Sequence, residues 1–103
     1  MSFCYYQVEP EFKFKYISPS LDTYLGLGVV EAAMDNPYDC FERSHPDDVE
    51  QLHDKVTGKL DYSQPILQHW SGPGGEYLWF EEYASPVYHD GQLIAVQGNS
   101  ILD

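Results

Sequence analysis

The chain has 103 residues, of which 17 are Asp or Glu and five are Lys or Arg, so its formal net charge is 5 − 17 = −12. This charge argues against nucleic acid or an anionic membrane surface as a partner, because both require clustered cationic side chains. The length indicates one domain, and a hydrophobic content of 43% excludes a disordered tail.

The apolar segment from Tyr24 to Met34 is shorter than the roughly 20 residues that a membrane-spanning helix needs. The first residues lack the basic and apolar regions of a secretory signal. We therefore expect a cytoplasmic protein with no membrane insertion by this segment.

Two aromatic-rich segments near the start predict an antiparallel hairpin. Aromatic residues at 12, 14 and 16 alternate with Lys13 and Lys15, which is the period of a half-buried strand ending near Ile17. Residues 3–8 form the preceding strand, and residues 9–11 form the turn.

Short helices are predicted next. Ser18 and Pro19 have the pattern of a helix cap and first helical residue, and Gly26 ends that helix. Val29 to Asp35 forms another helical turn, and Asn36 is expected to cap a third short helix.

The longest helix is expected to run from Pro46 to Gly58, with His45 at the cap. Asp47 and Asp48 then lie in its first turn, where the helix dipole favours negative charge. We interpret these three polar residues as capping groups and not as a metal cluster, because consecutive helical carboxylates point about 100° apart.

Three further strands are expected, at Gln64 to Ser71, Tyr77 to Val87 and Leu93 to Leu102, separated by Gly-rich turns. The order of elements predicts an α+β fold with one antiparallel sheet and helices packed on one face. Alternation along the second of these strands gives two apolar faces, so the outer face is expected to pack on a partner. The two sets are Leu78, Phe80 and Ala84, and Tyr77, Trp79 and Tyr83.

Four motifs, in this order and spacing, resemble a PAS domain, specifically the fold-3 subgroup found in bacterial signalling proteins. They are residues 16–20 (YISPS) with Leu25-Gly26, residues 45–48 (HPDD), residues 75–79 (GEYLW), and Asp90-Gly91 with an apolar strand reaching Gly98. The turn before the third motif is Gly-Pro-Gly-Gly where the family has an acidic turn, and only Asp103 could begin the closing motif of the family.

The resemblance implies a PAS-like five-stranded antiparallel sheet of strand order 2-1-5-4-3, with short helices and one longer helix on one face. It also implies that residues 1–103 are one sensory domain excised from a larger signalling protein. The expected effector, after the C-terminal end, is a GGDEF-type diguanylate cyclase or a histidine kinase. PAS domains typically pair through the outer face of the sheet or flanking helices, so a homodimer is expected.

A small-molecule ligand is expected in the space between the longest helix and the sheet. It would shift the population between two arrangements and thereby signal to the effector. The predicted pocket residues are Leu52, His53 and Val56 from the helix, and Leu78, Phe80, Ile94 and Val96 from the sheet.

The resemblance makes two cofactors of PAS proteins relevant to this sequence. Haem-binding PAS sensors ligate iron from the longest helix, and their His-Asp pair resembles His53-Asp54. The sequence contains only one arginine, Arg43, that could pair with the propionate groups of a haem. Photoactive flavin domains have a cysteine near the position of Cys40, but their following residues differ from those here. Flavin is not expected, and Cys40 is interpreted as a small buried hydrophobe.

Two alternatives remain open. One is a PAS fold without a small ligand, which acts as a dimerisation module. The other is a small stand-alone α+β enzyme, although the sequence has no nucleophile-elbow motif and no phosphate-binding loop. No catalytic residue is predicted.

Overall fold

Five strands form one antiparallel sheet with the order β2-β1-β5-β4-β3 in the computed structural model, which describes residues 1–103. This order is the one that the resemblance implied, and the α+β class is confirmed. The strands are β1 (Ser2–Gln7), β2 (Lys13–Ile17), β3 (Ile66–Ser71), β4 (Tyr77–His89) and β5 (Gln92–Leu102).

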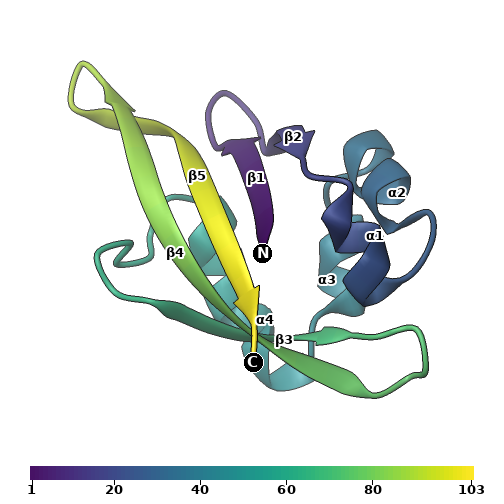
Figure 1. The fold of residues 1–103 in the computed structure, drawn as a ribbon. Coiled ribbons are helices and arrows are strands. Elements are labelled where there is room, and N and C mark those ends of the chain that lie inside the picture. Colours follow the sequence, from purple (N-terminus) through teal and green to yellow (C-terminus); the bar gives the residue numbers. More distant parts are fainter.

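The helices lie between β2 and β3 in the sequence. They are α1 (Ser20–Leu25), α2 (Val29–Asp35), α3 (Asp39–Arg43) and α4 (Val49–Val56), and a 3-10 turn (Pro46–Asp48) leads directly into α4. In Figure 1, α1, α2 and α3 lie together on the right, and the β4–β5 hairpin projects beyond the other strands at the upper left. No helix is both long and apolar enough to cross a membrane.

The start of the longest helix follows the predicted capping pattern. The Nδ1 atom of His45 accepts a hydrogen bond from the backbone N–H of Asp47 at 3.0 Å, and Pro46 occupies the first position. This bond satisfies one of the backbone donors that a helix start leaves free.

Two of the other predicted caps differ from the structure. The Oγ atom of Ser18 accepts a hydrogen bond from the N–H of Phe3 at 2.9 Å, so this side chain ties β1 to the end of β2 and does not cap α1. The amide oxygen of Asn36 accepts from the N–H of Tyr38 at 3.2 Å, in the turn that precedes α3.

The core fills the space between the sheet and the helices. Its larger cluster joins β1, α3, α4, β3 and β5, and a smaller cluster joins α1, α2 and β4. Burial of each large apolar side chain contributes about 1.5–3 kcal/mol to folding. The larger cluster comprises Tyr6, Val8, Phe12, Cys40, Leu52, Val56, Tyr62, Ile66 and Val96, and the smaller one Leu25, Val29 and Phe80.

The outer face of the sheet exposes large apolar side chains. Tyr77, Trp79 and Tyr83 are 44%, 49% and 47% exposed, whereas Phe80 on the opposite face of β4 is 1% exposed. The two apolar sets expected along this strand therefore face in opposite directions, one into the core and one out of it.

Candidate functional site

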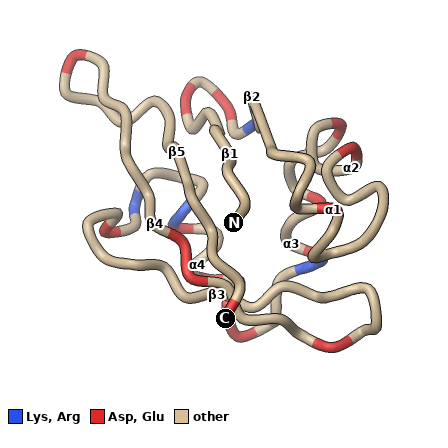
Figure 2. Tube along the Cα trace, in the orientation of Figure 1, with Lys and Arg blue, Asp and Glu red and all other residues tan.

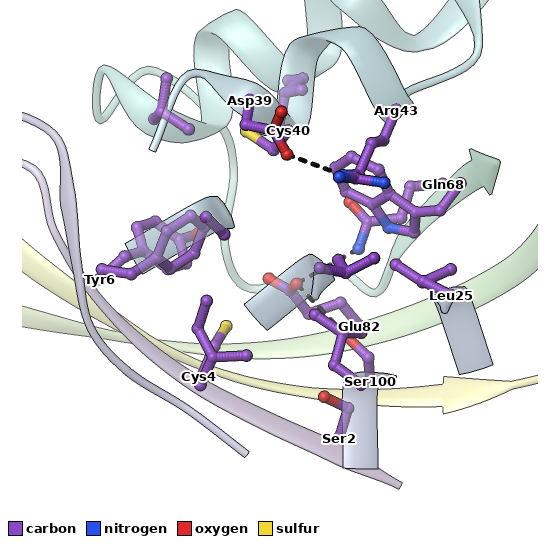
Figure 3. A pocket seen from close by; sticks show the side chains of 18 of the residues that line it. Ser2, Cys4, Tyr6, Leu25, Asp39, Cys40, Arg43, Gln68, Glu82 and Ser100 are labelled. Carbon is purple, nitrogen blue, oxygen red and sulfur yellow. Dashed lines mark hydrogen bonds and ion pairs between the residues drawn. The ribbon is translucent and has the colours of Figure 1, made fainter. Parts of the chain in front are cut away.

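A cavity of about 80 Å³ lies between the inner face of the sheet and the helices. Every strand and every α-helix contributes to its wall, and most of its lining side chains are apolar. Figure 3 shows the polar groups that interrupt this apolar wall, and they come mainly from β1, α3, β3, β4 and β5. They are Ser2, Cys4, Tyr6, Asp39, Cys40, Arg43, Lys55, Gln68, Glu82 and Ser100.

A buried ion pair joins the longest helix to the sheet at this cavity. The Nζ atom of Lys55 in α4 donates to Glu82 Oε1 in β4 at 2.7 Å, and also to Gln68 Oε1 in β3 at 3.2 Å. Gln68 in turn donates from Nε2 to the same Glu82 oxygen at 3.3 Å. The Lys55 and Glu82 side chains are only 7% and 2% exposed, so the pair is almost entirely removed from water.

The local sequence explains why both charges point inward. Lys55 lies three residues after Leu52 and directly before Val56, so it shares the buried stripe of α4. Glu82 lies two residues after Phe80, and alternation along β4 therefore places it on the inner face. Each charged side chain is thus held in the interior by buried apolar neighbours on its own element.

Electrostatics keep the lysine charged. Burial by itself lowers the pKa of the Lys55 ammonium, but the adjacent Glu82 carboxylate outweighs this effect and the net pKa lies above its ordinary value. The ring of Tyr6 lies 5.6 Å from the ammonium and adds a favourable cation–π contact.

Two polar atoms in the cavity wall have no hydrogen-bond partner within the protein. They are the phenol oxygen of Tyr6 and the second carboxylate oxygen of Glu82, Oε2, and both residues are 1% exposed. Gly98 in β5 makes room for this carboxylate, because a Cβ atom at Gly98 would lie 2.9 Å from Glu82 Cδ. The carboxylate therefore lies against the backbone of the last strand.

A second ion pair lies on α3 at the cavity wall. The Nε atom of Arg43 donates to Asp39 Oδ2 at 2.7 Å, one helical turn earlier, as the dashed line in Figure 3 shows. Their side chains are 31% and 21% exposed, so this pair is more accessible to solvent than the one between Lys55 and Glu82. Exposed pairs of this kind contribute little to stability.

Both cysteines line the same cavity. Burial raises the pKa of the Cys4 thiol to about 12, and the nearby Glu82 carboxylate adds to this effect. Burial likewise raises the pKa of Cys40 to about 11. Since the thiolate is the reactive form, both side chains are poor nucleophiles at neutral pH.

The structure brings two of the seven predicted pocket residues to the cavity, Leu52 and Val56. Phe80 belongs instead to the smaller core cluster, against which Leu78 packs, and Val96 is fully buried in the larger one. The remaining strand residue, Ile94, is partly buried and its carbonyl accepts from the N–H groups of Val8 and Glu9.

The seventh residue, His53, does not fit a haem site in this structure. Its side chain is 61% exposed, its Nδ1 lies 4.0 Å from Asp54 Oδ1, and it is absent from the cavity wall. An axial ligand must reach the iron from inside the binding pocket. His53 is therefore not positioned to ligate a haem iron in this cavity.

The histidine of β3 has a partner that its isolated position in the sequence did not suggest. His69 donates from its backbone N–H to Asp48 Oδ2 at 2.7 Å, and its ring Nδ1 lies 2.9 Å from the same oxygen. The two residues meet because the start of the longest helix lies against β3. No group of three or more His, Cys, Asp or Glu side chains could hold a metal ion.

Comparison with known proteins assigns the family. A family model described as the PAS fold, PAS_3, matches residues 14–100, which is most of the chain. The chain belongs to the PAS_3 family. A PAS domain is a sensory module of signalling proteins and is not itself catalytic. No protein in the curated set matches.

Solved structures support the fold of this PAS domain. A domain of a histidine kinase described as light and redox sensing, from Haloarcula marismortui, has a TM-score of 0.79 at 19% identity, covering 98% of this chain and 87% of that one. The N-terminal domain of a diguanylate cyclase with a PAS/PAC sensor, from Marinobacter aquaeolei, has a TM-score of 0.74 at 19% identity, covering 98% and 93%.

A photoreceptor domain is also similar. The LOV domain of a blue-light-activated histidine kinase from Erythrobacter litoralis has a TM-score of 0.65 at 14% identity, covering 98% of this chain and 94% of that one. At these identities the similarity concerns the fold.

The polar part of the cavity was missed by the sequence analysis, although a signal was present. Glu82 interrupts the inward-facing apolar set of β4, and Lys55 interrupts the apolar stripe of α4. Charged residues are almost never fully buried unless they are paired. Opposite charges at inward positions on two elements that pack together are the pattern that would have predicted this ion pair.

We expect Lys55→Met to destabilise the domain by about 3–5 kcal/mol, because it leaves the Glu82 carboxylate buried without its counter-ion. The double variant Lys55→Met/Glu82→Met should recover most of the loss, since it removes both charges and retains similar volume. Urea denaturation followed by circular dichroism measures both.

The matched control is Arg43→Met, which removes the cation of the more exposed pair and should cost less than about 1 kcal/mol. A double variant as unstable as Lys55→Met would contradict the coupling between the two buried charges.

We expect stability to fall steadily as the pH rises above 9. The Cys4 and Cys40 thiols have raised pKa values in the folded state, so the unfolded chain releases protons from pH 9 upward while the folded chain retains them. Loss of the Lys55 charge at still higher pH acts in the same direction, because its pKa is also raised.

Denaturation of wild type and Cys4→Ala/Cys40→Ala at pH 8 and pH 11 tests this dependence. The variant should lose roughly 5 kcal/mol less than wild type over this range, about half from each thiol. Equal losses in the two proteins would show that the thiols do not contribute to the alkaline slope.

Proposed function

We propose that this PAS domain is a cytoplasmic sensory module of a bacterial signalling protein, and that a small ligand in the cavity controls its output. The supporting observation is that the buried polar groups of the cavity belong to the elements that hold the sheet and the longest helix together. A molecule that contacts these groups alters the contacts between the two layers, which is the differential affinity that a population shift requires.

The last strand is the proposed output. Ser100 in β5 lines the cavity, and its hydroxyl lies 3.5 Å from Glu82 Oε1. A Cβ atom at Gly98 in the same strand would lie only 3.0 Å from Glu82 Oε2, so the backbone of β5 also leaves room for the other carboxylate oxygen. Occupancy of the cavity therefore acts on β5, whose C-terminal end would lead to the effector.

The proposed effector is a diguanylate cyclase of the GGDEF type or a histidine kinase, with residues 1–103 as one excised domain. The similar domains from Marinobacter aquaeolei and Haloarcula marismortui are described as parts of such proteins. The catalytic activity would then belong to the effector and not to this domain.

A ligand-free dimerisation role has its own supporting observation, which is the composition of the outer face of the sheet. Of the acidic residues, only Glu81 and Glu82 lie in strands, and Glu82 faces inward. Figure 2 shows the other carboxylates on helices and loops. Two copies of a chain with a net charge of −12 therefore repel each other least across this face, which also exposes the apolar surface expected of an interface.

We expect Ala33→Leu, which adds apolar volume at the cavity wall on α2, to mimic an occupied cavity. Hydrogen–deuterium exchange should change at least threefold more for amides 97–102 of β5 than for amides 92–96, because only the former lie beside the cavity. Ala32→Leu is the matched control, since Ala32 lies on the same helix but outside the cavity wall. Equal changes along β5 in both variants would contradict the relay.

We expect the wild-type chain to sediment as a dimer at micromolar concentration and Ile101→Asp to sediment as a monomer. Ile101 is 40% exposed on the outer face, and a carboxylate there places like charges in the interface. Leu27→Asp is the control, because Leu27 is 97% exposed in the loop between α1 and α2. Monomeric wild type, or a dimer unaffected by Ile101→Asp, would rule out pairing through the sheet.

A further inference from the structure

The cavity contains a carboxylate oxygen that can only accept a hydrogen bond and has no donor within the protein. Glu82 Oε1 accepts hydrogen bonds from Lys55 and Gln68. Glu82 Oε2 has no partner, although the residue is 1% exposed and lines the cavity. A buried polar atom without a partner costs about 1–3 kcal/mol, and more when it carries charge. A molecule with an N–H or O–H group removes this cost when it binds.

The phenol of Tyr6 is the second free group. Burial raises the pKa of Tyr6 well above its ordinary value, and the charge of Glu82 adds to the shift, so the hydroxyl stays protonated. It can therefore donate to an acceptor atom of a bound molecule. The cavity thus offers one charged acceptor and one neutral donor.

The charges of the wall select against anions. Lys55 pairs with Glu82, and Arg43 pairs with Asp39 through Nε, so the two cations and the two carboxylates of the wall balance each other. An anionic ligand at Glu82 Oε2 would place two negative charges side by side, and the ammonium nearest to them is already paired with that carboxylate. A neutral donor has no such penalty, and its hydrogen bond to the carboxylate is charge-assisted.

The remaining wall sets the size and the character of the molecule. Its apolar side chains include Phe12, Phe14, Ile17, Leu21 and Val29, so the body of the ligand must be apolar. A cavity of about 80 Å³ is roughly half the volume that holds benzene in a protein interior, so the ligand must be smaller than that six-membered ring.

We propose that the cavity binds a small neutral molecule with an apolar body and an N–H or O–H group, and that this group donates to Glu82 Oε2. The proposal rests on the ligand-binding function proposed above and specifies the chemical class of the ligand.

Pyrrole and furan form a suitable pair of probes, because the two rings have nearly the same shape and only pyrrole has an N–H donor. Titration of the isotope-labelled chain by NMR, followed at the amides of Leu52 and Val56, gives the dissociation constant of each. We expect pyrrole to bind at least fivefold more tightly than furan, and the carboxylate acetate to bind more weakly than acetamide, a neutral molecule of the same shape.

Two variants connect this preference to the named atoms. Lys55→Met/Glu82→Met removes the charged acceptor and should reduce the preference for pyrrole over furan to less than twofold. Tyr6→Phe removes only the phenol oxygen, and should weaken binding of pyrazole, which adds an acceptor nitrogen to the ring of pyrrole, at least threefold. Tyr5→Phe is the matched control, since Tyr5 lies in the same strand but outside the cavity wall and should bind like wild type.

The outcomes separate the two proposals. Equal binding of pyrrole and furan, or tighter binding of the carboxylate, overturns the donor class but leaves a ligand-binding cavity. Failure of all probes to bind wild type overturns the inference, and water is then the occupant of the cavity. If the double variant does not fold, retention of wild-type affinity for pyrazole in Tyr6→Phe still counts against the proposal. The relay is judged separately by the exchange of β5.

Discussion

The ion pair between Lys55 and Glu82 is the constraint on which the arrangement of the two layers depends. Neither charge can be left alone in the interior, since removing one partner of a buried pair costs several kcal/mol. The pair therefore fixes the distance and the rotation of α4 relative to β4, because only a narrow range of positions retains the 2.7 Å contact. Gln68 extends this constraint to β3 through hydrogen bonds to both charges.

Two weaker contacts hold the same helix against the edge of the sheet. Gln51 donates from Nε2 to the carbonyl of Leu67 at 2.8 Å, and Asp48 accepts from the backbone of His69 at 2.7 Å. All three attachments lie on β3 or β4, so α4 is held over this part of the sheet, whereas α1–α3 lie together at the right in Figure 1. The cavity lies where these two groups of helices meet the inner face.

The sequence predicted the architecture better than the site, for a physical reason. Alternation in β4 and the proline at the start of the longest helix are local signals, and local signals determine which element forms and which face is buried. The cavity depends on how elements distant in the sequence meet. Leu52 and Val56 line the cavity because α4 is amphipathic, whereas Phe80 and Val96, also predicted as pocket residues, are buried in the core by close packing.

Gly98 has a consequence for how sequences of this kind can change. Its backbone supports the Glu82 carboxylate, and a methyl group there would also come within 3.2 Å of Cys4 Sγ. Positions 82 and 98 therefore cannot vary independently. A descendant that gains a side chain at position 98 must have a shorter or uncharged residue at position 82. Lys55 must then be replaced as well, because it would lose its counter-ion. Three positions from three segments of the chain would therefore change together in the course of evolution.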